Sequence, residues 1–226
     1  MSTAPKSDGP WTRGLGNKPL PILYNKDKTV WPQSATNPSP LVMPDGSINL
    51  YFTASDQNNP CGLESNCIGM ATSVNGWEGP FVPVEEHLTY PESEDASVFI
   101  DPRGNFHMLT NVNTGHARCA LGVECGGHAW SKDGRHWTNL TIGAFGPRIT
   151  FANGTVWHNA YTERPLVTQA EDGTPLAFYV GMGRTAYMDC CNHPQLFCTG
   201  KPGELCGPTI TPKADPKKDA AGNALR

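Results

Sequence analysis

The sequence predicts an all-β protein of the β-propeller type, and three observations support this fold class. The 226 residues include 24 Gly and 21 Pro, a turn content that suits many short strands better than a helical bundle. The longest apolar runs, such as Leu176–Val180, have the length of a strand and not of a membrane span. A plan of two strands around a turn also recurs three times along the chain.

The repeated plan consists of a polar start, a β-rich run, a turn and a second β-rich run. The turn is Asp-Gly or Pro-Arg-Gly, which favours the positive φ that hairpins require. A further hairpin follows the first two copies, at Ile68–Phe81 and Gly127–Trp137. Units of four strands joined by long loops are typical of propeller blades. The three copies cover Asn37–Phe52, Glu94–Leu109 and Thr162–Tyr179.

These repeats predict one propeller domain over residues 1–212. Met1–Trp11 resembles the late part of a blade, so the chain is expected to begin within a blade and to lack most of its first blade. The expected parts, in order, are a partial first blade at 1–30, blades near 31–90, 91–150 and 151–212, and a polar, flexible tail at 213–226.

The eight Cys residues indicate an oxidising compartment. Cys61 and Cys67 are six residues apart, as are Cys119 and Cys125, and each pair lies between the second and third strands of its unit. This spacing favours disulfide-closed loops over a zinc site. The pairing among the other four stays open, and these are Cys190, Cys191, Cys198 and Cys206.

Two N-glycosylation sequons, which begin at Asn139 and Asn153, also favour an extracellular, glycosylated protein. The opening residues carry no signal-peptide pattern. The cysteines and the sequons together predict an extracellular location, although these 226 residues do not include a signal peptide.

Charge and motifs exclude several classes of protein. Charged residues make up 17% of the chain and the net charge is -4, so no basic face for nucleic acid is expected. Membrane partners are not expected either. The sequence lacks the Gly-x-Ser-x-Gly elbow, the P-loop and the His-Glu-x-x-His motif, which sets aside serine hydrolases, P-loop enzymes and zincins.

The starts of the repeats contain the candidate site. Asn37, Asp95 and Glu163 are spaced by 58 and 68 residues and are interpreted as equivalent positions of the innermost strands. Such positions converge on the central channel of a propeller, so we expect these side chains to face a common pocket. Two carboxyl groups across a pocket suit glycoside cleavage. The alternative, that they are turn or capping residues, stays open.

Two of these segments resemble a known family. Glu94–Asp101 with Gly104–His107, and later Thr162–Leu166, look like blade starts of glycoside hydrolase family 43, and more closely of its secreted eukaryotic relatives. The likeness extends from about Trp11 to Val180. The resemblance implies a five-bladed propeller and an inverting hydrolase of arabinose- or xylose-containing carbohydrate, with a carbohydrate as its partner.

The family resemblance also implies roles for individual residues. Asp95 matches the Asp that tunes and orients, and Glu163 matches the general acid. The general base of the family opens a blade that would precede Met1, whereas Asn37 stands at the intervening position and cannot accept a proton as a carboxylate does. If Asn37 were instead the counterpart of the base, the protein would be an impaired relative that binds sugar.

Other residues are weaker candidates. His128 is expected on an inner or second strand near the channel, where it would support the site or an ion, with a buried structural His as the alternative. Arg164 could hold the acid or a substrate hydroxyl, and Trp31 and Trp157 could stack on sugars. Trp77 and Trp137 occupy matched repeat positions and are predicted to pack the blades.

No cofactor and no protein-bound metal site is predicted, and a calcium ion in the channel is the one ion for which the family resemblance leaves room. The first hypothesis for function is a secreted glycoside hydrolase. A carbohydrate-binding or structural propeller without activity is the second, and a disulfide-rich extracellular interaction module is the third.

Overall fold

The computed structural model describes residues 2–3, 12–13, 34–55, 66–84, 93–112, 125–151, 153–158, 161–183 and 191–196. Within these ranges the regular structure is almost all β-strand, apart from a short 3-10 helix at Gly76–Glu78. The prediction of an all-β protein is therefore confirmed. None of the described helices is long and apolar enough to cross a membrane.

Three antiparallel sheets follow one another along the chain, and in each the strands pair in sequence order. The first contains β3 (Ser34–Val42), β4 (Ile48–Ser55), β5 (Cys67–Ser73) and β6 (Val82–Pro83). The second contains β7 (Ser93–Ile100), β8 (Phe106–Val112), β9 (Cys125–Ser131) and β10 (Thr141–Phe145). The third contains β13 (Tyr161–Gln169), β14 (Pro175–Gly183) and β15 (Cys191–Leu196).

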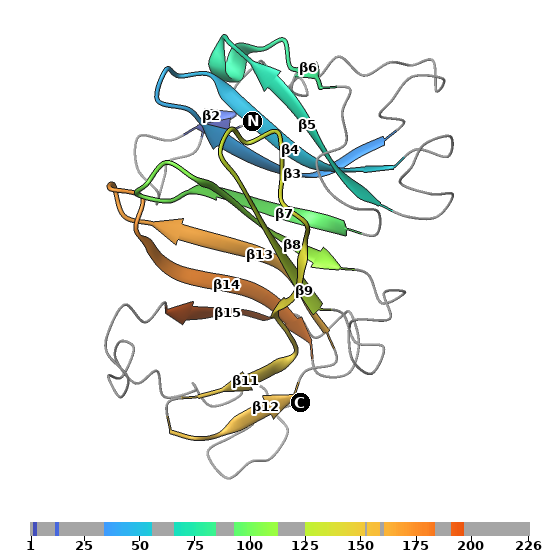
Figure 1. The fold of residues 1–226 in the computed structure, drawn as a ribbon, viewed down its shortest axis with the longest axis vertical. Coiled ribbons are helices and arrows are strands. Elements are labelled where there is room, and N and C mark those ends of the chain that lie inside the picture. The colour runs from blue at the N-terminus through green and yellow to red at the C-terminus, as the bar shows by residue number, and fades with distance from the viewer. Residues whose placement is uncertain are drawn as a thin grey trace.

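Two small hairpins accompany these sheets. One pairs β1 (Ser2–Thr3) with β2 (Thr12–Arg13), and the other pairs β11 (Arg148–Thr150) with β12 (Val156–His158). Figure 1 shows the three sheets stacked face to face, with the first sheet at one end and the β11–β12 hairpin at the other. In this stack β7 lies between β3 and β13, so the first strands of successive sheets are neighbours.

In each of the three larger sheets, the first two strands are joined by the same tight turn. The N–H of the last residue before the turn donates to the carbonyl of the residue four positions later. The N–H of the turn Gly donates back to the carbonyl of that same first residue. Gly46, Gly104 and Gly173 take φ values of 83°, 82° and 83°, the left-handed region that glycine enters without steric cost. The Asp-Gly and Pro-Arg-Gly sequences thus form the hairpins that they predict.

Apolar side chains fill the spaces between the sheets. The cluster between the first and second sheets contains Tyr51, Ile68, Met70, Ala96, Val98, Phe106 and Met108. Between the second and third, Phe99 and Leu109 pack against Val167, Phe178, Val180 and Met182. Side chains alternate along a strand, so the middle sheet supplies residues to both clusters from opposite faces.

The first strands are also joined by two equivalent hydrogen bonds. The N–H of Val98 donates to Oγ of Ser39 at 3.4 Å, and the N–H of Val167 donates to Oγ of Ser97 at the same distance. Each bond links one sheet to the next at the same height along the strand. The recurrence of the same contact supports the repeat that the sequence predicts.

Candidate functional site

Each first strand is interrupted by a β-bulge at the place where the sequence predicts the candidate residues. The strand pairing shifts between Thr36 and Ser39, between Glu94 and Ser97, and between Glu163 and Leu166. In each case two residues of the first strand lie opposite one residue of its partner, which is the signature of a bulge. Bulges often re-aim side chains beside functional sites.

The first bulged residue is Asn37, Asp95 or Arg164, and it has a positive φ each time. These φ values are 50°, 56° and 52°, and they are the described non-glycine residues with positive φ. Asn and Asp tolerate this conformation better than other residues, whereas Arg rarely adopts it. Strained backbone at three equivalent positions favours a functional role there.

The bulges correct the predicted alignment of the repeats. Glu163 was expected at the same position as Asn37 and Asp95, but the residue equivalent to these two is Arg164. Glu163 lies one residue earlier and corresponds to Thr36 and Glu94. An alignment that matches the carboxylates places the third repeat one residue out of step. The strand pairing shows that the equivalent positions are those of the bulges and not those of the acidic residues. Pro38 and Pro165, which share the next position, would have given the correct alignment.

The three first strands bring the predicted residues together around Asp95. Nδ2 of Asn37 donates to Oδ1 of Asp95 at 2.5 Å, and Nε of Arg164 lies 3.9 Å from Oδ2. Nη1 of Arg164 in turn donates to Oε1 of Glu163 at 2.7 Å. We call Asn37, Asp95, Glu163 and Arg164, with Asn111 described next, the bulge cluster.

Sequence reasoning missed Asn111, which lies on β8 and is almost fully buried. Its Nδ2 donates to Oδ2 of Asp95 at 3.3 Å, whereas its Oδ1 is buried and has no hydrogen-bond partner among the described residues. The backbone N–H of Asp95 donates to Oγ1 of Thr53 at 3.0 Å. Only the strand pairing reveals these contacts, since Asn111 faces Glu94 across the β7–β8 ladder.

Burial and donors define the chemistry of the bulge cluster. Asp95 and Glu163 are 6% and 5% exposed, whereas the side chain of Arg164 is 63% exposed. Both oxygens of Asp95 accept from amide donors and one lies near a cation, an arrangement that suits an ionised carboxylate. Glu163 is buried beside a guanidinium that is largely exposed to solvent. The cluster therefore combines one carboxylate held by amide donors with one that is paired to an exposed cation.

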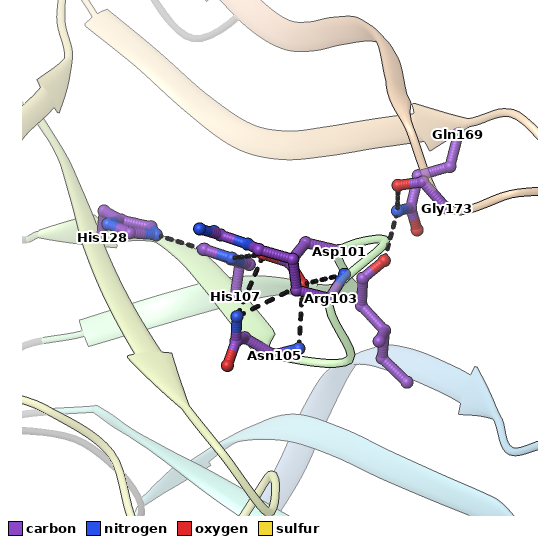
Figure 2. Close-up of polar contacts among 8 residues, drawn as sticks. Asp101, Arg103, Asn105, His107, His128, Gln169 and Gly173 are labelled. Carbon is purple, nitrogen blue, oxygen red and sulfur yellow. Dashed lines mark hydrogen bonds and ion pairs between the residues drawn. The ribbon is translucent and has the colours of Figure 1, made fainter.

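His128 does not lie where the sequence analysis placed it. It was expected on an inner or second strand near the channel, but it lies on β9, the third strand of its sheet. Its Nε2 is 3.0 Å from Nδ1 of His107, and Nε2 of His107 is 3.3 Å from Oδ2 of Asp101. Figure 2 shows these three side chains in a row, which we call the histidine chain.

Asp101 anchors the histidine chain at the β7–β8 turn. Burial alone would raise the pKa of Asp101, but hydrogen bonds from Asn105, Arg103 and His107 outweigh it and hold the pKa well below its usual range. Asp101 directly follows β7, whereas Asp95 lies near the start of that strand. Strand geometry therefore separates the histidine chain from the bulge cluster along β7.

Of the two predicted aromatic platforms, only Trp157 lies among the described residues, and the ring contact described for it is with Phe151 and not with the bulge cluster. Trp31 lies outside the described residues. Trp157 lies on β12, half-buried, with its ring edge-on to Phe151 at 4.8 Å. Trp77 and Trp137 pack against the apolar clusters, as predicted. A cavity of about 260 Å³ lies beside Trp137 and is also lined by Trp130 and Asp133.

The described residues do not supply a metal site. No group of three His, Cys, Asp or Glu side chains within the described ranges could hold an ion. His128, the residue suggested for a channel ion, uses Nε2 in its bond to His107.

Cys67 and Cys125 begin β5 and β9 and are both disulfide-bonded. Their predicted partners, Cys61 and Cys119, lie outside the described residues, as do the side chains of the four later cysteines. The two pairings therefore stay predictions.

No known family profile matches the sequence, and no curated protein matches it significantly. Solved structures are similar in fold. An endo-arabinase from Bacteroides thetaiotaomicron has a TM-score of 0.52 and 18% identity, over 74% of this chain and 57% of that one. An endo-1,4-beta-xylanase from the same bacterium has a TM-score of 0.52 and 16% identity, over 88% and 63%. A thermostable family-43 glycoside hydrolase has a TM-score of 0.57 and 17% identity, over 95% and 66%.

Stacked antiparallel sheets and these similarities define the fold as that of the β-propeller glycoside hydrolases. Within that class the fold is like family 43, as the motifs of the sequence predict. The chain spans between 57% and 66% of the length of these three proteins. Similarity at this level of identity establishes the fold, and function has to be argued from the site.

Proposed function

We propose that the protein is a glycoside hydrolase that cleaves arabinose- or xylose-containing oligosaccharides or polysaccharides with inversion. The observation that carries the proposal is the bulge cluster. Three successive first strands deliver Asn37, Asp95 and the Glu163–Arg164 pair to one group joined by hydrogen bonds and ion pairs, in a fold similar to that of glycoside hydrolases.

Glu163 is proposed as the general acid that protonates the leaving oxygen. A carboxyl group that is 5% exposed is disfavoured as an anion by desolvation, which helps it keep a proton. The guanidinium of Arg164 opposes this, because its Nη1 lies 2.7 Å from Oε1 of Glu163. Arg164 must therefore turn away when substrate binds, and its exposed side chain is free to do so. The released guanidinium would then donate to a sugar hydroxyl.

Asp95 is proposed as the orienting carboxylate. Asn37 and Asn111 each donate to one of its oxygens, so the carboxylate is held in one orientation. A charge fixed in this way biases the protonation of a neighbouring acid, here through Arg164, which contacts both carboxylates. The general base required for inversion has to come from outside the bulge cluster, since its other side chains carry no carboxyl group.

A second candidate is a propeller that binds carbohydrate without cleaving it. The observation that favours it is Asn37, an amide at one of the three bulges, bonded to Asp95. An amide cannot act as a general base. The two candidates share the same ligand class and differ in turnover.

The test uses the Glu163→Gln variant, with Glu171→Gln as control because Glu171 is an exposed Glu on the β13–β14 turn. Hydrolysis of aryl arabinofuranosides and xylosides, arabinan and xylan is measured together with oligosaccharide binding. General acids contribute about 10²–10⁴-fold, so we expect a loss of that order in kcat for E163Q with polysaccharide, and retained binding. Unchanged turnover in E163Q would overturn the assignment of the acid. Binding without turnover in the wild type would select the second candidate.

The protein is also proposed to act outside the cell as a glycoprotein. The disulfide-bonded Cys67 and Cys125 support an oxidising compartment. Asn153 is exposed in the turn between β11 and β12, where its Oδ1 accepts the N–H of Thr155. A sequon at the tip of a hairpin is accessible to a glycosyltransferase. Expression in a secretory host and enzymatic removal of N-glycans would show the mass change, and N153Q would abolish the contribution of this site.

A further inference from the structure

We propose that His107 and His128, on neighbouring strands of the second sheet, share a single added proton and form a pH-sensitive latch connected to the turn that contacts the third sheet. The latch accepts one proton without displacing either ring and opposes a second. This inference concerns the histidine chain and does not depend on the proposed hydrolase activity.

The two imidazole rings meet end to end. Their centroids are 5.2 Å apart and their planes differ by 16°, whereas the facing nitrogens are 3.0 Å apart. The centroid separation is close to the nitrogen separation plus one ring radius at each end, so both nitrogens lie near the line between the ring centres. This is the geometry of an in-plane N–H···N hydrogen bond and not of two stacked rings.

Asp101 fixes the direction of this bond. It is an ionised acceptor, so Nε2 of His107, at 3.3 Å, carries a hydrogen and donates to it. In a neutral ring Nδ1 of His107 is then an acceptor, and Nε2 of His128 donates to it. The donor and the acceptor of both hydrogen bonds in the histidine chain are thereby fixed.

One added proton fits the same geometry. Protonated at Nδ1, His107 becomes a cation between Asp101 and His128 and donates to both, while His128 moves its own hydrogen from Nε2 to Nδ1. A second proton would place two N–H groups face to face at 3.0 Å. The hydrogen bond would then be replaced by repulsion between two cations.

The surroundings penalise the second charge further. His107 stacks on Phe99 at 5.1 Å and 15°, and Phe99 packs against the apolar cluster shared with the third sheet. Burial, and after it the charge of His107, lower the pKa of His128. The other charged groups of the packed turns are Arg103 beside Asp101, and Glu171 and Asp172 on the β13–β14 turn, all exposed.

The histidine chain is connected to the third sheet through the β7–β8 turn. Nε2 of Gln169, at the end of β13, donates to the carbonyl of Ile100 at 2.6 Å, and Ile100 precedes Asp101. Figure 2 shows Gln169 and Gly173 reaching this turn from the neighbouring sheet. Disruption of the His107–His128 bond is therefore expected to weaken this contact, which is one of several that join the second and third sheets.

The test compares the wild type with His128→Gln, because an amide can donate to neutral His107 or accept from its cation. Denaturant unfolding is measured from about pH 7.5 to about pH 4.5, around the ordinary His pKa of about 6.5. Since His128 has a lowered pKa in the native state, the unfolded chain binds more protons, and stability falls as the pH drops below that value. In this acid range the wild type is expected to take up nearly one proton when it unfolds, and H128Q should remove that uptake. The control His158→Gln, at an exposed His, should leave the proton uptake unchanged.

Two readouts on the wild type keep the proposal testable if a variant fails to fold. Long-range ¹H–¹⁵N spectra are expected to show both hydrogens on Nε2 at neutral pH and two well-separated titration steps. Hydrogen exchange at the N–H of Val167, which donates to Ser97, is expected to accelerate after the second step, once corrected for the intrinsic rate. Coincident, independent titrations of the two His residues, or an acid-induced loss that persists in H128Q, would overturn the latch.

Discussion

The side-chain amide of Asn37 donates to the carboxylate of Asp95 at 2.5 Å, although 58 residues separate them in the sequence. Both residues have a positive φ, and each is the first bulged residue of its strand. The bond thus joins two equivalent positions of successive sheets. It makes the orientation of Asp95 dependent on the neighbouring sheet as well as on its own.

Replacing Asn37 by Asp should convert this bond into a contact between two carboxyl groups. One of them must take up a proton, or the two anions must separate. Because a hydrogen bond to a charged group contributes about 1.5–3 kcal/mol and Asn37 is exposed, we expect a loss near the lower end, about 1.5 kcal/mol, at pH 7. The loss should shrink at pH 4. Urea denaturation measures it, with N153D as control, since Asn153 is also an exposed turn Asn. Equal effects of the two changes would contradict the prediction.

Replacing Arg164 by Asn should affect the pH dependence of catalysis more than stability. Asn tolerates the φ of 52° better than Arg does, which offsets part of the loss of the ion pair between the exposed Arg164 and the buried Glu163. Without the guanidinium beside it, Glu163 keeps its proton to higher pH. The alkaline limb of the kcat/KM profile should therefore move upward, and R148N, at an exposed Arg on β11, should leave it in place. A shift to lower pH would contradict the role given to Arg164.

Replacing Gly173 by Ala should destabilise the protein more than replacing Gly104 by Ala. Both glycines have nearly the same φ, so both variants incur a backbone strain of about 1–2 kcal/mol. A Cβ at Gly173 would lie 3.1 Å from the carbonyl oxygen of Ile100, whereas nothing lies within 4 Å of one at Gly104. We expect roughly 1 kcal/mol of additional loss for G173A in urea denaturation. Equal losses of unfolding free energy in the two variants would indicate that the β13–β14 turn does not pack tightly against Ile100.

Replacing Asp101 by Asn should lower stability at neutral pH and much less in acid. The native pKa of Asp101 is depressed, so its carboxylate stabilises the fold above the unfolded pKa, and this contribution is lost as the pH falls through the native pKa. Because its carboxylate accepts charge-assisted hydrogen bonds from Arg103, Asn105 and His107, we expect a measurable loss at pH 7. The difference in unfolding free energy between the two proteins should begin to shrink below about pH 4, the usual Asp pKa, and should close only as the pH approaches the lower native pKa. A constant difference across that range would contradict the assignment.

Much of the fold could be predicted because its determinants are local. The Asp-Gly and Pro-Arg-Gly turns and the alternating runs around them lie within single hairpins, so the repeat is visible in the sequence. The convergence of Asn37, Asp95 and Glu163 followed from the propeller plan. Their roles in a reaction remain predictions.

The details of the site depend on pairings that the sequence does not display. Every first strand carries the same bulge, but Asp95 is its first residue whereas Glu163 lies one residue before it, and the ladder shows this offset directly. Asn111 and the two residues His107 and His128 acquire their partners from neighbouring strands. A lone His in a sequence gives no sign of the second imidazole that faces it.

The repeated bulge has a consequence for how such a protein can diversify. Its first residue stands outside the in-and-out alternation of the strand, so a change of identity there does not turn any neighbouring side chain to the other face of the sheet. Asn, Asp and Arg already occupy this position in one chain, with the same backbone conformation. The same bulge can therefore carry an amide, an anion or a cation. A change among these side chains leaves the packed interior between the sheets as it is.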